Sequence, residues 1–87
     1  MHGNNASDNK RTSIKLSAAY GAKVEIGFEP IGTSFELSDD ASIFLELPIE
    51  AVGELQIVSW PNGMAIWVPY PGDYVVYDGA GNVLDRL

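Results

Sequence analysis

The residues that most often carry out catalysis are scarce in this chain. It has no cysteine, and its single histidine is His2, close to the N-terminus. Nucleophilic catalysis needs an activated serine, cysteine or lysine beside a base, so a Ser-His-Asp arrangement does not fit this sequence. A zinc site of cysteine and histidine ligands is excluded for the same reason. We therefore expect a protein that is not an enzyme and that uses no cofactor.

Carboxylates are the one abundant group with chemical potential. The formal net charge is −7, and the five basic residues are Lys10, Arg11, Lys15, Lys23 and Arg86. No lysine or arginine lies between Val24 and Asp85, where the acids are Glu25, Glu29, Glu36, Asp39, Asp40, Glu46, Glu50, Glu54, Asp73, Asp78 and Asp85. Such a charge distribution repels nucleic acids and anionic membranes and attracts basic proteins. Net negative charge also has a simpler explanation, because it keeps a small protein soluble.

The acids could in principle do more than set the surface charge. Paired carboxylates hydrolyse glycosidic bonds in many enzymes, but acids on alternate strand positions are normally a solvated face. Asp39-Asp40 and the segment 78–82 are rich in oxygen ligands, yet neither has the spacing of an EF-hand loop. Both segments fit turn chemistry equally well, so we expect no metal site, and a weak surface calcium site is the alternative.

Aromatic residues form a second unusual group, with five of them between positions 60 and 77: Trp60, Trp67, Tyr70, Tyr74 and Tyr77. Exposed tryptophan and tyrosine serve as anchors at protein interfaces and as platforms for sugars. The alternative is a second layer of the core, because monomers seldom leave large apolar patches bare.

The elements that position these residues are predicted to be strands. Short runs of β-branched, aromatic and aliphatic residues are separated every 8–12 residues by glycine, proline, asparagine or aspartate, which predicts a small antiparallel β-sandwich or barrel of seven to eight strands. We expect strands near 12–18, 23–29, 33–37, 42–47, 54–60, 64–68, 73–78 and 82–86, with one helical turn around 49–53. Residues 1–11 are predicted to be a disordered polar tail, and residues 12–87 a single all-β domain.

The dipeptide Asn62-Gly63 lies between two apolar runs and favours a two-residue type I′ hairpin. This turn would place Trp60 opposite Ala65, so that Trp60 and Trp67 share the wetter face and are close enough to touch. If Val68 pairs with Asp73, Tyr74 adds a third ring to that face.

Part of the chain has the order of elements of a known family. Leu45–Ile49, Gly53–Ile57, Met64–Pro69 and Pro71–Tyr77 contain a strand, a glycine-bearing strand and a Pro-Gly-Asp-Tyr hairpin. In this the chain resembles the bacterial competence-associated nuclease inhibitors and similar small β-sandwich proteins. The resemblance covers residues 43–78 and implies inhibition of a nuclease by direct binding.

The sequence therefore predicts an acidic inhibitor or immunity-type binder of a basic protein such as a nuclease. The expected anchors are Trp60, Trp67 and Tyr74, with Glu54, Asp73 and Asp78 as a charged rim. One alternative is a carbohydrate-binding or extracytoplasmic module that uses the same aromatic face. Another is a structural subunit that joins other chains through its edge strands.

The compartment is predicted only by default. No apolar run approaches the length needed to cross a bilayer, and the first residues lack the apolar segment of a signal peptide. A cytoplasmic location is the expectation from these features, and a signal that had already been removed would leave no trace.

Overall fold

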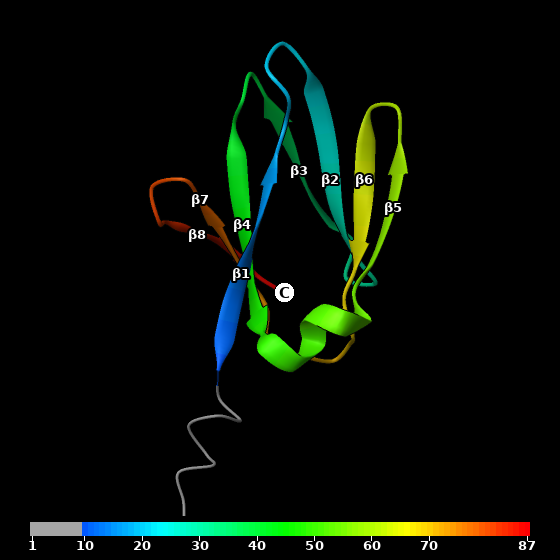
Figure 1. Ribbon diagram of the computed structural model, residues 1–87, viewed down its shortest axis with the longest axis vertical. Coiled ribbons are helices and arrows are strands. Elements are labelled where there is room, and N and C mark those ends of the chain that lie inside the picture. The colour runs from blue at the N-terminus through cyan, green and yellow to red at the C-terminus, as the bar shows by residue number, and fades with distance from the viewer. Residues whose placement is uncertain (1–9) are drawn as a thin grey trace, which may run out of the picture.

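The computed structural model describes residues 10–87, which form two four-stranded β-sheets joined by short loops (Figure 1). The first sheet, sheet A, has the order β1-β4-β7-β8, and the second, sheet B, has the order β3-β2-β6-β5. The elements are β1 (Arg11–Ser17), β2 (Lys23–Glu29), β3 (Thr33–Ser38), β4 (Ser42–Pro48), η1 (Ile49–Glu54), β5 (Gln56–Trp60), β6 (Gly63–Trp67), β7 (Val75–Asp78) and β8 (Val83–Arg86). The predicted all-β sandwich is confirmed, and the predicted strand ends lie within two residues of those observed.

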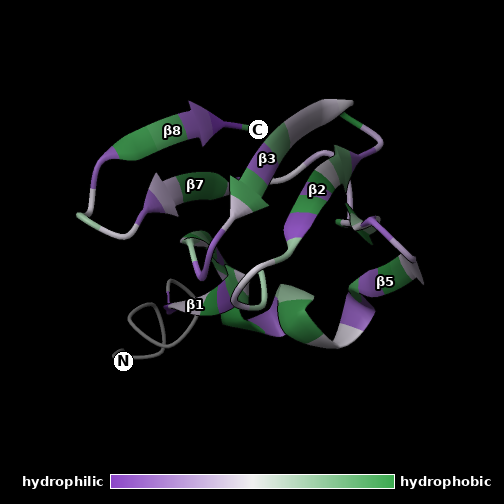
Figure 2. Ribbon diagram, turned by 90° about the horizontal axis from the view of Figure 1, so that it is seen from above, coloured by the Kyte–Doolittle hydropathy of each residue, from purple (hydrophilic) through white to green (hydrophobic). Residues whose placement is uncertain are grey.

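Alternation along the strands places the core between the sheets. In β4, Ile43, Leu45 and Leu47 are buried, while the residues between them are only half-buried. The largest fully buried side chains come from both sheets, and they are Phe28, Ile26, Leu45, Leu47, Ile66 and Val76. The alternation of apolar and polar residues is visible along the ribbon in Figure 2. Apolar burial of this kind supplies the main driving force for folding, since the chain has no disulfide.

Asp39 and Asp40, the oxygen-rich pair, lie in the turn that connects β3 to β4. Both residues have positive φ, 51° and 68°, as the two central residues of a type I′ turn require. The Asp39 backbone N–H donates to the Ala22 carbonyl at 3.2 Å, which ties this turn to the β1–β2 loop. These two aspartates are therefore turn residues where the chain passes from sheet B to sheet A.

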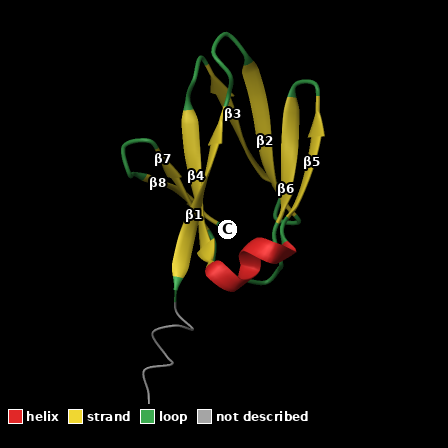
Figure 3. Ribbon diagram, in the orientation of Figure 1, coloured by secondary structure: helices red, strands yellow, loops and turns green. Residues whose placement is uncertain are grey.

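One strand pair departs from the antiparallel expectation. β2 and β6 pair in parallel, with Glu25 opposite Gly63 and Glu29 opposite Trp67. The departure arises because β4 is followed by η1, a short 3₁₀ helix that crosses from sheet A to sheet B at one end of the molecule (red in Figure 3). The helical turn expected around 49–53 is confirmed. This crossing brings β6 beside β2, and so it decides which residues surround the tryptophans.

The predicted tail boundary at residue 11 is too late. The Lys10 carbonyl accepts a hydrogen bond from the Ile49 N–H at 3.1 Å, and Arg11 begins β1. The rest of the predicted tail, residues 1–9, lies outside the described residues.

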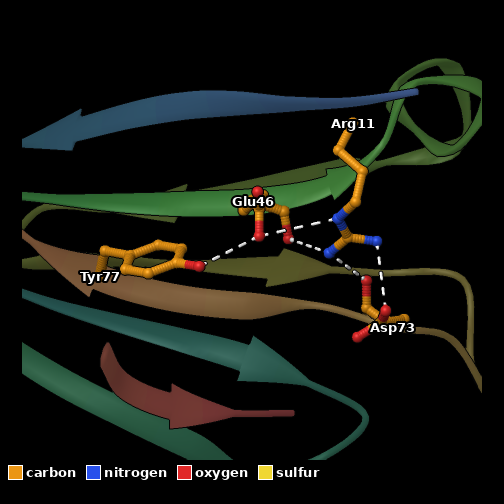
Figure 4. A network of polar contacts seen from close by, with 4 residues as sticks. All are labelled: Arg11, Glu46, Asp73 and Tyr77. Atoms are coloured by element: carbon orange, nitrogen blue, oxygen red, sulfur yellow. Dashed lines mark hydrogen bonds and ion pairs between the residues drawn. The ribbon is translucent and has the colours of Figure 1, made fainter. Parts of the chain in front are cut away.

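Arg11 is held by contacts with two other segments (Figure 4). Its guanidinium lies 3.6 Å from the Glu46 carboxylate and 3.4 Å from the Asp73 carboxylate, and it donates to the Asp73 carbonyl at 2.8 Å. The Tyr77 hydroxyl also donates to Glu46, at 3.3 Å. These contacts connect β1, β4 and the segment that precedes β7.

No helix within residues 10–87 is both long and apolar enough to span a membrane.

Candidate binding face on sheet B

The turn of the β5–β6 hairpin lies one residue earlier than predicted, which shifts the strand pairing by two residues. Trp60 lies opposite Gly63, so the central turn residues are Pro61 and Asn62, and neither has positive φ. The predicted type I′ turn at Asn62-Gly63 is therefore wrong. Proline supplies the φ near −65° that suits the first central position of an ordinary turn, which removes the need for glycine in the turn itself.

Gly63 is needed for a different reason. A Cβ atom at this position would lie 2.5 Å from the Glu25 carbonyl oxygen and 2.9 Å from two ring atoms of Trp60. The Trp60 ring therefore lies against the Gly63 backbone, where β2 and β6 also approach each other closely. Only a residue without a side chain permits both contacts.

The two tryptophans share a face but do not form a pair. Because the register differs by two residues, every side chain keeps the face that the sequence predicts. Trp60 and Trp67 are 46% and 43% exposed, so partial accessibility on one face is confirmed. Trp67 lies four residues along β6 from the residue opposite Trp60, which is a separation of about 13 Å along the strand. The expected contact between the two rings is therefore wrong.

Tyr74 does not belong to this face. It is 3% exposed and packs in the core, because β7 pairs with β4 and β8 in sheet A instead of continuing sheet B beside β6. Its hydroxyl donates to the Pro69 carbonyl. Burial, and next the negative charge of Glu54, raise the pKa of Tyr74. The expectation of Tyr74 as an exposed third ring is wrong, and a buried ring cannot anchor a partner.

The three predicted rim acids lie on three different segments, and two of them already have partners. Glu54 ends η1 and lies close enough to Tyr74 to influence its ionisation. Asp73 is paired with Arg11 beside sheet A. Asp78 closes the β7–β8 turn, where its carboxylate accepts from the backbone N–H groups of Ala80 and Asn82 at 2.9 and 2.8 Å. The structure therefore does not assemble the predicted rim into one site.

The turn role of Asp78 predicts a pH dependence. Hydrogen bonds from the Asn82 backbone and side chain are the main cause that lowers the pKa of the Asp78 carboxyl in the folded protein. A lowered folded-state pKa stabilises the fold above the unfolded-state value, about 4, and this contribution is lost as pH falls through the folded-state pKa. Asp78→Asn is expected to be less stable than wild type at pH 7, and the difference should shrink as pH falls below about 4. Denaturant midpoints measured across pH 2–7 check this, and a constant difference would contradict it.

Three other acids lie on the same outer face of sheet B as the tryptophans. Glu25 and Glu29 point to the outer face of β2, beside the β6 positions occupied by Gly63 and Trp67. Glu36 lies on the same face of β3, directly opposite Glu25. We call these three glutamates together with Trp60 and Trp67 the Trp–Glu face.

Small residues form the floor of the Trp–Glu face. Gly27 of β2 pairs with Ala65 of β6, midway between the two tryptophans, and neither side chain extends far above the backbone. The strand alternation in 23–29 could show that Glu25 and Glu29 share a face, but it could not show that this face adjoins the tryptophans.

Glu25 and Glu36 form the most unusual contact of this face. They are exposed like charges on directly opposed positions of antiparallel strands, an arrangement that destabilises a sheet. Within residues 10–87 the ion pairs are those of Arg11 with Glu46 and Asp73, so neither glutamate is neutralised by a described side chain. The two line an open pocket of about 570 Å³, together with Lys23 and the hairpin turn at Pro61-Asn62.

The Trp–Glu face brings carboxylates and exposed indole rings onto one surface of sheet B. Among the described residues no three histidine, aspartate or glutamate side chains are grouped so that they could hold a metal ion. The Trp–Glu face instead combines carboxylates that accept hydrogen bonds with two flat apolar surfaces, which suits a cationic or a polyhydroxylated partner.

Comparison of the chain with protein-family models, with curated proteins and with solved structures finds no match in any of the three.

Proposed function

We propose that this protein acts without catalysis, as a binder of a basic protein surface through the Trp–Glu face. The observation that carries the proposal is the directly opposed pair Glu25 and Glu36 beside an open pocket. A lysine or arginine side chain placed between them would relieve their repulsion and form charge-assisted hydrogen bonds. The partner would then contribute a cation that neutralises this pair of carboxylates.

The two tryptophans supply the apolar contact area that the carboxylates cannot provide. Charged rims mainly raise association rates, whereas buried aromatic side chains carry most of the affinity at protein interfaces. Trp60 and Trp67 are each nearly half exposed, so each can still bury a large apolar area against a partner. The same rings can stack on guanidinium or ammonium groups. A basic enzyme such as a nuclease, as the family resemblance also implies, is the partner class that fits both features.

The proposal predicts that charge position matters more than net charge. The Glu25→Gln/Glu36→Gln variant should bind a basic nuclease, with an isoelectric point above about 9, roughly tenfold more weakly than wild type at low salt. The variant Glu50→Gln/Glu54→Gln removes the same charge from exposed positions on η1 and should lose much less affinity. Surface plasmon resonance across a salt series measures both, and wild-type affinity should fall as salt rises.

Other outcomes of this experiment would change the assignment. Equal losses in the two double variants would show that only net charge matters, and failure to bind any basic protein at low salt would refute the proposal. Trp67→Ala should weaken binding while it keeps the thermal midpoint, because Trp67 is not part of the core. Retention of wild type on a glycan matrix, lost in Trp67→Ala, would assign the face to carbohydrate instead.

A further inference from the structure

The edge strand β5 of sheet B is unusually exposed to solvent. All five residues from Gln56 to Trp60 are exposed, and Ile57 is 54% exposed although its alternation places it on the inner face. β5 pairs with β6 on one side, and none of the other strands in residues 10–87 lies on its other side. Figure 1 shows β5 as the outermost strand of its sheet, and Figure 2 shows it on the side of the molecule away from β8. Its outward backbone N–H and C=O groups are therefore free to pair with another strand.

The other three edges within residues 10–87 carry protective features that β5 lacks. Charged side chains, bulges and prolines on an edge strand discourage pairing with another chain. β1 carries Arg11 and Lys15, and β3 carries Glu36. β8 carries Asp85 and Arg86, and its pairing with β7 is interrupted by a register shift. β5 has no charge, no proline and no irregularity in its pairing with β6.

The uncharged region extends well beyond β5. No acidic or basic residue occurs from Leu55 to Gly72, in a chain with 17 charged residues out of 87. A basic partner would find no carboxylate along this edge. For a second copy of the chain, in contrast, an uncharged edge is favourable. Two molecules of net charge −7 can approach closely only where neither presents an acid.

We propose that β5 pairs with β5 of a second copy, antiparallel and centred on Val58. This register opposes Val58 to its own counterpart, Ile57 to Ser59 of the partner subunit, and Trp60 to Gln56 of the partner subunit. All five residues of each strand are then paired, and no charged residue opposes another. On the inner face the two Ile57 side chains occupy diagonal positions, about 7–8 Å apart, where long apolar side chains can touch.

The proposed register also separates the nearest acids. Glu54, which precedes β5, lies four residues from the centre, so the two copies of Glu54 are eight residues apart along the paired strands. At about 3.3 Å per residue this distance is about 26 Å, or more than two Debye lengths at physiological ionic strength. Their mutual repulsion is therefore largely screened.

The dimer would join the two copies of sheet B into one continuous sheet of eight strands. The two-fold axis of an antiparallel strand pair runs perpendicular to the sheet, so both Trp–Glu faces would point to the same side. A partner with two basic patches could then engage both copies, which raises its apparent affinity without any new contact. The pairing itself does not depend on the proposed function, because it uses the backbone of β5.

The test is the oligomeric state of the full chain by sedimentation and light scattering from about 10 μM to 1 mM. Wild type should change from 9.4 kDa toward twice that mass as concentration rises. Val58→Glu and Val58→Lys each place like charges at the two-fold and should weaken dimerisation by about tenfold or more. An equimolar mixture of the two variants should restore the dimer, because opposite charges then face each other.

Val83→Glu is the matched control. Val83 is 47% exposed on β8, an edge of the other sheet, and Val58 is 44% exposed on β5. The control adds the same charge at a similar exposure and should dimerise like wild type. If the Val58 variants do not fold, amide exchange in wild type supplies the readout: residues 56–60 should be protected more strongly at 500 μM than at 5 μM.

Salt separates this proposal from the binding of a basic protein. Added salt should strengthen the dimer, because it screens the repulsion between two acidic molecules, whereas it should weaken the binding of a basic protein. A wild type that stays monomeric at about 1 mM in high salt would overturn the proposal. The proposal would also be overturned if Val58→Glu dimerised as strongly as wild type, or if a mixture of Val58→Glu and Val58→Lys did not associate.

Discussion

Replacement of Gly63 by alanine is expected to lower the free energy of unfolding by about 1–3 kcal/mol, and valine should lower it further. The added Cβ would lie 2.5 Å from the Glu25 carbonyl oxygen, which belongs to the backbone of β2. A backbone atom cannot move aside as a flexible side chain can, so the parallel pairing of β2 with β6 must open or the hairpin must shift. The Trp60 ring, 2.9 Å from the same Cβ, would also be displaced.

Thermal unfolding of Gly63→Ala and Gly63→Val measures this effect. For a domain of this size, 1 kcal/mol corresponds to a change of about 4–8 °C in the midpoint. Gly79→Ala is the control, because a Cβ at Gly79 would meet no atom within 4 Å and Gly79 has no positive φ. Its midpoint should stay close to that of wild type. If Gly63→Val unfolds at the same temperature as Gly79→Ala, the close approach of β2 to Gly63 is wrong.

Truncation of Tyr74 to alanine should cost more, about 3–5 kcal/mol, as for other fully buried aromatic side chains. The Tyr74 ring is 3% exposed, belongs to the core cluster and packs against the Gly72 backbone. Loss of this much stability would leave little margin in a small domain. Tyr74→Phe keeps the ring and loses only the hydrogen bond to the Pro69 carbonyl, so its cost should be about 0.5–1.5 kcal/mol.

Tyr20→Ala is the control for the tyrosine variants. Tyr20 is 89% exposed in the β1–β2 loop, so its removal should change stability little. Denaturant unfolding of the four proteins should rank Tyr74→Ala as the least stable, then Tyr74→Phe, with Tyr20→Ala close to wild type. Equal midpoints for Tyr74→Ala and Tyr20→Ala would show that Tyr74 is exposed, and Tyr74 would again be a candidate binding anchor.

The strands and their faces could be predicted from local sequence. Alternation in 42–47 correctly separated Ile43, Leu45 and Leu47 from the residues between them, because the two faces of a strand are set by its own backbone geometry. The common face of Trp60 and Trp67 was also correct, even though the predicted turn was not. A register error of two residues moves neighbours along the strand and leaves every side chain on its original face.

Turn position was less predictable, because two local preferences competed. Asn62-Gly63 matches the commonest type I′ pair, yet Pro61 and Asn62 form the turn and Gly63 lies within β6. The glycine is required by a neighbour, β2, that is 38 residues away from it in sequence at Glu25. The type I′ geometry instead occurs at Asp39-Asp40, where both residues adopt positive φ without glycine.

The sequence by itself determined the all-β class, the approximate strand positions and the net negative charge. Tertiary structure alone decided that Tyr74 is buried, that β2 lies beside β6, and that Glu25, Glu29 and Glu36 share one face of sheet B with the tryptophans. The physical reason is the range of the interactions. Hydrophobic alternation and charge are properties of neighbouring residues. The order of strands in a sheet depends instead on where η1 and the loops carry the chain between the two sheets.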